Sequence, residues 1–368
     1  MNAVFSILFV QAPPGAFDNF WHHEIGARFS LFGLGVLAWS ARNFAAVRRL
    51  QAPAATAPQP AGRHAGPAIL VTGATGFIGS ALVKQLLAEG RRVIVCSRDI
   101  LQARRSFPGA WVVDRLDDIP GETRIDAVVH LAGAATLGAP WTRRRRELLV
   151  GSRTGLMQQL LALMRRLDQP PRVLVGASAV GFYGVPEGRD PLDETAPPQP
   201  GRFQSDLCAA VEHEARRAEA LGVRVVRLRL GIVLGAQGGA YPALALSSRL
   251  GLGARLGSGQ QPVPWIHIDD AVGLLRFAIE QQTLSGAVNA VAPELASQTT
   301  FAREMAAAFG RKVVLRVPGW ALQAALGEMS ELLRCGQWAV PTAALAAGYR
   351  FRQRSLRGAM AALAGGRL

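Results

Sequence analysis

Short apolar runs alternate with longer helix-patterned stretches from residue 68 to about residue 235. The runs are almost continuously apolar, which is typical of strands in a parallel sheet that is covered by helices on both faces. The chain is therefore expected to form an α/β fold with a doubly wound parallel sheet, and ligands bind such sheets beyond the carboxyl ends of the strands. The predicted strands are 68–73, 92–97, 110–114, 126–133, 172–178 and 223–231.

Beyond residue 235 the alternation weakens into a glycine-rich stretch, and helices are predicted around 271–281, 299–309 and 320–333. Upstream, a proline- and alanine-rich stretch has the composition of a linker. Five segments are expected: an apolar extension of helical character over 1–50, a linker over 51–67, the α/β domain over 68–235, a smaller substrate-facing lobe over 236–317, and a C-terminal helical segment over 318–368.

The extension contains two apolar runs, 3–10 and 29–40, and neither reaches the roughly 18 to 20 apolar residues that span a bilayer. The first run lacks the basic leading region and cleavage pattern of a signal peptide. Because the second is followed by Arg42, Arg48 and Arg49, it is interpreted as an interfacial helix or short membrane hairpin, with a helix packed on the main domain as the alternative.

The formal charge of +15 raises nucleic acid or an anionic membrane surface as partners. Nucleic acid is not expected, because no aromatic platform is interleaved with the arginines and no binding motif accompanies them. Three scattered cysteines form neither a disulfide framework nor a zinc site, which favours a reducing compartment. The protein is therefore expected in the cytoplasm, at the inner membrane face if residues 1–50 bind a membrane.

No metal site is expected. His22, His23 and Glu24 are adjacent in the chain, and adjacent side chains on a helix point about 100° apart. No other group of residues has metal-ligand spacing.

A glycine-rich turn joins the first predicted strand to a predicted helix. The spacing is G-x-x-G-x-x-G, in which Gly73 permits a tight turn, Gly76 a close approach of the backbone, and Gly79 packing of helix on strand. Backbone N–H groups at a helix N-terminus bind a pyrophosphate. A dinucleotide site of the Rossmann type is therefore predicted, formed by Thr72, Gly73, Thr75, Gly76, Phe77, Ile78 and Gly79 in this turn and by Leu131, Ala132 and Gly133 after the fourth strand.

The end of the second strand indicates which dinucleotide binds. A site for NAD usually carries a carboxylate there, which holds the ribose 2′-hydroxyl, whereas this chain has Ser97 and Arg98. An arginine can neutralise a 2′-phosphate, so NADP(H) is favoured over NAD(H). Asp99, one position further on, leaves NAD open as the alternative.

These motifs follow one another in the order found in the extended short-chain dehydrogenase/reductase superfamily, which the chain therefore resembles. More narrowly, it resembles an atypical NAD-dependent epimerase/dehydratase-like, or sugar-nucleotide-epimerase-like, family over 69–363. This resemblance implies a Rossmann fold, NADP(H) binding and a short family-specific C-terminal domain. The matching segments are TGATGFIG (72–79), DAVVHLAG (126–133), GSR (151–153), SAVGFYG (178–184), RLRLGIVLG (227–235), GLGARLGSGQQ (251–261), WIHIDD (265–270), GAVN (286–289) with AP (292–293), and LGEM (326–329).

This chain departs from the family at two positions. Ala134 stands where members resemble LAGE, and Pro140 stands where they usually carry an arginine before Trp141. The run 143–146, four arginines, is either a substitute for that arginine or a solvated first helical turn.

The superfamily uses a Tyr-x-x-x-Lys pair for proton transfer. No lysine of this chain lies three or four residues from a tyrosine, and the segment where the pair is expected reads FQSDLC (203–208). Ser178 and Tyr183 are the remaining catalytic candidates, although Ala179 occupies the usual serine position. Asp206, Cys208 and Glu212 are weaker candidates.

In the WIHIDD segment, His267 is a candidate for orienting a substrate. Asp269 or Asp270 is expected to cap the helix that follows.

The sequence therefore predicts an NADP(H)-dependent oxidoreductase or epimerase-like enzyme that acts on an unidentified small molecule. The alternative is a non-catalytic NADP(H)-binding sensor or scaffold, tethered at a membrane by the N-terminal segment. Oligomers are compatible with either hypothesis.

Overall fold

A seven-stranded parallel sheet forms the centre of the protein, in the strand order β11-β6-β5-β4-β1-β2-β3. The computed structural model describes residues 66–365. All six predicted strands are present, and the expected doubly wound parallel sheet is confirmed. The strands are β1 (Ala68–Thr72), β2 (Val93–Cys96), β3 (Trp111–Val113), β4 (Ile125–His130), β5 (Val173–Ala179), β6 (Arg224–Leu230) and β11 (Gly286–Ala290).

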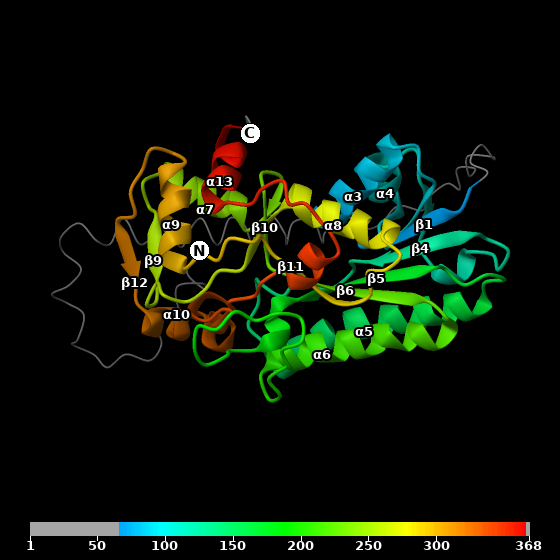
Figure 1. The fold of residues 1–368 in the computed structure, drawn as a ribbon, viewed down its shortest axis with the longest axis horizontal. Coiled ribbons are helices and arrows are strands. Elements are labelled where there is room, and N and C mark those ends of the chain that lie inside the picture. The colour runs from blue at the N-terminus through cyan, green and yellow to red at the C-terminus, as the bar shows by residue number, and fades with distance from the viewer. Residues whose placement is uncertain (1–65, 366–368) are drawn as a thin grey trace, which may run out of the picture.

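Helices cover both faces of this sheet, as Figure 1 shows. One face is covered by α3 (Phe77–Ala88), α4 (Ile100–Ser106) and α8 (Ile268–Glu280), and the other by α5 (Arg143–Arg166) and α6 (Phe203–Arg216). Successive residues of β1 enter opposite cores, with Val71 in one and Leu70 in the other, and both are fully buried. Burial on both faces explains why the strands are apolar without interruption.

The strand order reverses between β1 and β4, because the chain runs from β1 through β2 to β3 on one side and then continues with β4 on the other side of β1. Thr72 at the end of β1 is in register with His130 at the end of β4, so the two carboxyl ends lie side by side. The Thr72 hydroxyl and His130 Nδ1 are 2.7 Å apart and buried. A crevice outside two such strand ends is where open α/β sheets bind ligands.

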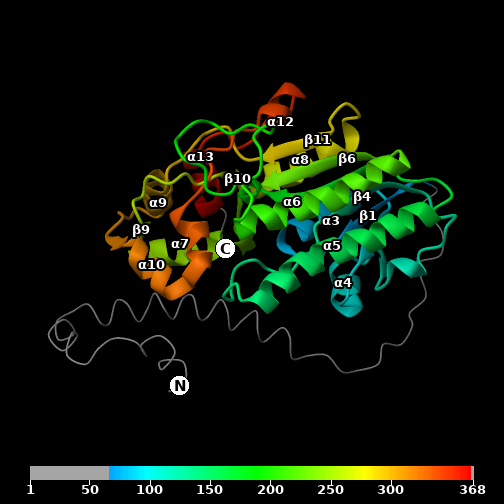
Figure 2. The same cartoon turned by 90° about the horizontal axis from the view of Figure 1, so that it is seen from below.

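A second lobe packs beside these strand ends and has a core of its own. Trp265, Tyr241 and Phe301 of this core are buried with Leu356 and Met360 from the C-terminal helix. Figure 2 shows this lobe beside the main sheet. Its elements are β7 (Ile232–Gly235), β8 (Gly238–Gly239), β9 (Ala254–Leu256), β10 (Trp265–His267), β12 (Leu315–Val317), α7 (Tyr241–Arg249), α9 (Gln298–Ala307), α10 (Gly319–Leu326), α11 (Glu331–Arg334) and α13 (Leu356–Gly365). The short helix α12 (Thr342–Ala346) packs against β11 of the main sheet instead, and its Ala344 is fully buried there.

The lobe does not coincide with the expected segment 236–317. Within that segment, α8 and β11 return to the main sheet, where β11 pairs with β6 in parallel. The helix expected over 320–333 is also divided: α10 ends before Gly327, whose φ of 56° is left-handed, and α11 starts four residues later. Glycine adopts this conformation without steric cost, so the helix ends there.

The helix α8 (Ile268–Glu280) begins three residues before the expected start at 271, and the prediction that Asp269 or Asp270 caps it is wrong. His267 is the N-cap, and its Nδ1 accepts a hydrogen bond from the Asp269 backbone N–H. Asp270 is fully buried and binds the segment before α13 instead. A histidine nitrogen therefore accepts the capping hydrogen bond that a side-chain oxygen usually accepts.

The expectations for the extension and most of the linker, residues 1–65, lie outside the described residues, as does the cluster His22, His23 and Glu24. None of the helices between residues 66 and 365 has the length and hydropathy of a membrane-spanning segment.

The buried carboxylate of Asp270 leads to a prediction about stability. Its carboxylate accepts hydrogen bonds from the backbone N–H groups of Arg352 at 2.7 Å and Gln353 at 2.8 Å, and from the Tyr349 hydroxyl at 3.2 Å. Removing a buried charged acceptor leaves these donors unpaired, so Asp270→Ala should lower the free energy of unfolding by about 3 kcal/mol.

The matched control is Asp269→Ala, since the neighbouring carboxylate is 55% exposed. It should cost less than about 1 kcal/mol, the contribution of a charge in a first helical turn. Urea denaturation of both variants measures the difference, and equal costs would contradict the assigned role of Asp270.

Candidate functional site

Three backbone segments meet at the turn after β1. They lie so close together that only glycine fits between them. Gly73 has φ of 74°, and a Cβ on it would lie 2.6 Å from the Ala132 backbone nitrogen. A Cβ on Gly79 would lie 2.3 Å from the Gly73 carbonyl oxygen. The glycines therefore allow the turn to close against α3 and against the end of β4.

The N-terminus of α3 has the properties of an anion site. Its N-cap, Gly76, offers no side-chain cap, and no acidic residue lies in the first turn. The first backbone N–H groups of the helix are left for another acceptor. The residues present thus fit a pyrophosphate, which such N–H groups and the helix dipole bind.

Of the predicted turn residues, Thr75, Phe77 and Ile78 are half-buried. The Phe77 ring packs against the glycines of β7 and β8; a Cβ on Gly235 or on Gly238 would lie 2.6 Å from a ring carbon. The side chain of Phe77 therefore packs the second lobe against the glycine turn. The backbone N–H of Phe77 is the group that remains to bind a phosphate.

The loop after β4 is held by α5. Leu131 N–H donates to the Thr72 carbonyl at 3.1 Å, which ties this loop to the glycine turn. The Ala134 backbone N–H donates to Ser152 Oγ at 3.1 Å, and its carbonyl accepts from Arg153 Nη2 at 3.0 Å. Gly133 lets the Arg153 guanidinium lie close, since a Cβ there would be 2.9 Å from it. Although Ala134 lacks the family's carboxylate, its backbone is fixed.

The residues that follow β2 bear on whether the site prefers NAD(H) or NADP(H). Asp99 is the N-cap of α4, and its carboxylate accepts from the Gln102 backbone N–H at 2.8 Å. Ser97 Oγ donates to the Asp99 carbonyl at 3.3 Å, which fixes the turn between them. Arg98 is exposed, and no ion-pair partner of it is found among residues 66–365. The carboxylate is thus committed to a helix, whereas the guanidinium is available to a ligand.

The candidate Ser178 lies at the end of β5 over a buried ion pair. Its hydroxyl donates to Glu212 Oε1 at 2.8 Å. Glu212 is 3% exposed and accepts a bidentate pair from Arg229, at 2.8 Å from Nε and 3.0 Å from Nη2. Arg227 Nη1 donates to the same carboxylate at 3.1 Å. Glu212 therefore connects β5, α6 and β6.

The second candidate, Tyr183, ends the 3-10 helix η3 (Val180–Tyr183) and is 3% exposed. Its hydroxyl donates to Asn289 Oδ1 at 2.7 Å and accepts from Arg229 Nη1 at 2.9 Å. Burial raises the pKa of this phenol, although Arg229 opposes the shift. The geometry gives Tyr183 a part in the buried network of Glu212, and its predicted role as a proton donor stays a hypothesis.

The weaker candidates on α6 differ in their surroundings. Asp206 Oδ1 accepts from the Gly201 backbone N–H at 3.2 Å and is exposed. Cys208 is buried beside η3, and burial raises the pKa of its thiol to about 11. Gln204, one turn before Cys208, lies against Gly181 of η3, so the same face of α6 carries Gln204, Cys208 and Glu212.

His267, the candidate for substrate orientation, is 6% exposed. Burial lowers the pKa of its imidazole. Because Nδ1 accepts the capping hydrogen bond, the neutral ring carries its proton on Nε2. This nitrogen is the one that can donate to a ligand.

The arginine run at the start of α5 is not a uniformly solvated turn. Arg143 is 95% exposed, but Arg146 forms an ion pair with Glu328 and lies 4.9 Å from the centroid of the Phe203 ring. Met329 packs with Trp141 and Phe203 in one apolar cluster. The C-terminal segment thus covers the loop after β4.

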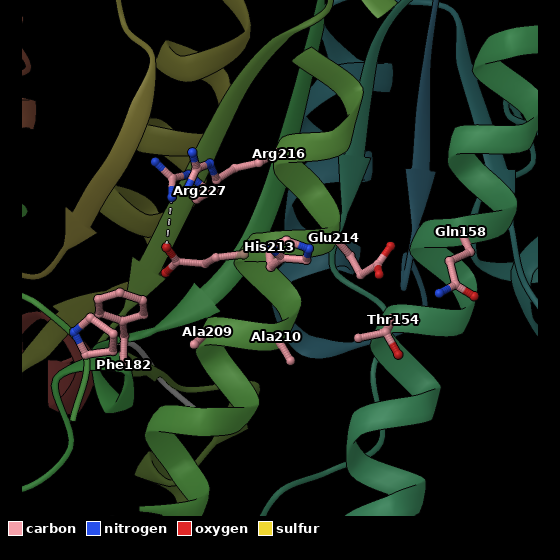
Figure 3. A pocket seen from close by; sticks show the side chains of 11 residues that line it. Thr154, Gln158, Phe182, Ala209, Ala210, His213, Glu214, Arg216 and Arg227 are labelled. Atoms are coloured by element: carbon pink, nitrogen blue, oxygen red, sulfur yellow. Dashed lines mark hydrogen bonds and ion pairs between the residues drawn. The ribbon is translucent and has the colours of Figure 1, made fainter. Parts of the chain in front are cut away.

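A separate cavity of about 600 Å³ runs along α5 and α6 (Figure 3). The ion pair of Glu212 and Arg227 forms part of its wall, next to Phe182. No residue of the glycine turn lines it. This cavity is therefore distinct from the predicted nucleotide site, which lies at the strand ends.

Several residues of the site were not singled out from the sequence. Arg229 is the clearest case, because an arginine in an apolar strand between two covering layers indicates a buried partner. Glu194 was missed as well; it accepts from the Asn289 and Ala343 backbone N–H groups at 2.9 and 3.1 Å. It lies in a loop, where a lone carboxylate carries no distinguishing pattern.

The fold and the glycine turn define a protein of the Rossmann-type nucleotide-binding class. The chain matches the NAD dependent epimerase/dehydratase family over residues 69–290, and a domain of unknown function, DUF1731, over residues 317–363. The chain belongs to this epimerase family, as its resemblance implied.

Similar proteins cover most of the chain. The epimerase family protein YfhF of Bacillus subtilis is 32% identical over 297 residues, which cover 80% of this chain and 97% of that protein. The human epimerase family protein SDR39U1 is 36% identical over 286 residues, 77% of this chain and 94% of that protein.

Solved structures agree with the fold. The crystal structure of human SDR39U1 with NADPH superposes with a TM-score of 0.74 at 34% identity, covering 81% of this chain and 99% of that one. UDP-glucose 4-epimerase of Thermotoga maritima superposes with a TM-score of 0.65 at 20% identity, covering 81% of this chain and 97% of that one. The second likeness concerns the fold alone.

The histidine beneath the glycine turn generates a pH prediction. Burial lowers the pKa of His130 from 6.5 to about 4. In the unfolded chain His130 takes up a proton near pH 6.5, whereas in the folded protein it does so only near pH 4. Unfolding therefore binds a proton between these values, and the free energy of unfolding falls as the pH is lowered through this window.

The full loss at pH 4 is about 3 kcal/mol, because one pKa unit corresponds to about 1.4 kcal/mol. His130→Asn should remove this part of the pH dependence, which urea denaturation at pH 7, 5.5 and 4 would measure. His213→Asn, at an exposed position on α6, is the control. A steep profile that persists in His130→Asn would show that other groups cause it.

Proposed function

We propose that this protein binds NADP(H) and acts as an oxidoreductase or epimerase-like enzyme on a small molecule. One observation carries the proposal: the uncapped α3 and its glycine turn lie beside a strand end where Asp99 is committed to α4 and Arg98 is exposed. The human relative crystallised with NADPH supports the same cofactor.

Different groups of the chain are proposed to bind different parts of the cofactor. Backbone N–H groups from Phe77 onward hold the pyrophosphate, Arg98 pairs with the 2′-phosphate, and the loop of Leu131 to Gly133 lies along the cofactor. Bound NADPH would give a hydride to a substrate carbon, and bound NADP⁺ would accept one from it. Ser178, with its proton directed to Glu212, presents its lone pairs to a substrate hydroxyl.

His267 is proposed to donate from Nε2 to the substrate. It lies at the end of β10, where the second lobe meets the main sheet through α8. The substrate would thus bind between the two parts of the protein, a common location for small-molecule sites.

A second function, that of a non-catalytic NADP(H) sensor, is favoured by one observation. Tyr183 is buried in a hydrogen-bonded network, and burial raises the pKa of both Tyr183 and Cys208, so neither group readily releases a proton. Consumption of NADPH with any carbonyl or sugar-nucleotide substrate would exclude this second function.

Membrane contact through residues 1–50 remains part of the proposal. It is tested with anionic vesicles, which should retain the full chain and release a fragment that starts at Ala68.

Removal of Arg98 tests the cofactor preference. In Arg98→Ala the dissociation constant for NADPH should rise about 10- to 100-fold, the effect of losing a charge-assisted contact of about 1.5 to 3 kcal/mol, while that for NADH changes little. Nicotinamide fluorescence measures both constants. Arg105→Ala, an exposed arginine of α4, is the matched control and should bind like the wild type.

Equal losses for NADPH and NADH would contradict the role of Arg98 at the 2′-phosphate. Binding of neither nucleotide by the wild-type protein would overturn the proposed function itself.

A further inference from the structure

One buried amide at the carboxyl end of β5 lacks the hydrogen bond that its burial requires. Gln204 is 7% exposed, and its Nε2 has no partner among the described residues. Leaving a buried donor unpaired is costly, because the group gives up its water and receives nothing in return. Buried amides elsewhere in the chain are satisfied: Gln261 Nε2 donates to the Leu256 and Leu333 carbonyls, both at 2.9 Å.

The backbone around Gln204 is built to hold this side chain in place. The next residue, Ser205, donates through Oγ to the Phe182 carbonyl at 2.6 Å and accepts from the Gln199 backbone N–H at 2.9 Å. The preceding Phe203 ring packs edge-on against Trp141, with centroids 5.0 Å apart. The first turn of α6 is therefore fixed to η3 on one side and to the loop after β4 on the other.

The absence of a side chain at Gly181 leaves space for the Gln204 amide. A Cβ on Gly181 would lie 3.4 Å from Gln204 Oε1 and 3.9 Å from the Cys208 sulfur. Both neighbours are uncharged, since burial raises the pKa of the Cys208 thiol and keeps it protonated. The charged groups that act on this thiol, Glu212 and Arg153, already have partners, so the unpaired amide matches a neutral oxygen acceptor.

The other polar groups at this strand end already have partners. Ser178 donates its proton to Glu212, and the Tyr183 hydroxyl donates to Asn289. A thiol is a weak donor. Gln204 Nε2 is therefore the strong neutral donor that stays unused at the end of β5, one strand from the loop of Leu131 to Gly133.

We propose that Gln204 binds the neutral oxygen of the substrate, a carbonyl or an alcohol, through its Nε2–H. This inference rests on the proposed function, since it places the reacting group of the substrate beside the cofactor. An amide does not release a proton at neutral pH, so Gln204 positions and polarises this oxygen, and the proton that accompanies hydride transfer comes from water.

The first experiment uses the cost of the unpaired donor. Gln204→Met, close in volume, removes the donor and should raise the Tm of the ligand-free protein by about 1–3 °C. Gln261→Met, the matched control, loses three hydrogen bonds and should lower the Tm. A Tm that falls in Gln204→Met as it does in Gln261→Met would overturn the proposal.

The second experiment observes the amide directly. In the NADPH-loaded full chain, cyclohexanone should shift the side-chain ¹⁵N–¹H₂ signal that disappears in Gln204→Met, and should leave the Gln261 signal in place. Cyclohexylammonium, which cannot accept a hydrogen bond, should shift neither. No response of the Gln204 signal to cyclohexanone would overturn the proposal.

The two proposals fail in different ways. If NADPH fluorescence shows no binding, the proposed function falls, while the Tm comparison still reports on the unpaired donor. If NADPH binds and by itself moves the Gln204 signal to its final position, the cofactor occupies the donor and the assignment to a substrate oxygen is wrong.

Discussion

The bidentate ion pair of Glu212 and Arg229 is the interaction on which the arrangement of β5, β6 and α6 depends. Taking two charges out of water costs several kcal/mol per ion, and the pair repays this only with good geometry and further hydrogen bonds. Here Glu212 also accepts from Arg227 and Ser178, and Arg229 also donates to the Tyr183 hydroxyl and stacks 3.5 Å from the centroid of the Phe182 ring. The pair thereby sets the positions of β5, β6 and α6.

The same network reaches the C-terminal segment through Asn289. Its Oδ1 accepts from Tyr183, its Nδ2 donates to the Val340 carbonyl at 2.9 Å, and its backbone N–H donates to Glu194. Glu194 in turn accepts from Ala343. The main sheet and the segment that the family description leaves without a function are thus joined by part-buried hydrogen bonds, in addition to the contact of Glu328 with Arg146.

The proposed nucleotide site is built differently, because backbone groups form it except at Arg98. Gly73 and Gly79 allow the turn, and the uncapped start of α3 provides the N–H groups. Such a site depends on local conformation and on one glycine spacing. The proposed substrate site depends on side chains from β5, η3, α6, β6 and β11, and its chemistry can therefore change while the proposed nucleotide site stays the same.

The sequence by itself determined the doubly wound sheet, the glycine turn with its place between strand and helix, and Arg98 at the end of β2, because each follows from local pattern and short spacing. It did not reveal that Asp99 and His267 cap helices, since capping depends on where a helix starts to within one residue. Only the tertiary structure decided that Tyr183 lies buried between Arg229 and Asn289, and that Gln204 is left without a partner. These pairings join residues 46 to 106 positions apart, and burial and partner choice at such separations depend on packing that no local pattern encodes.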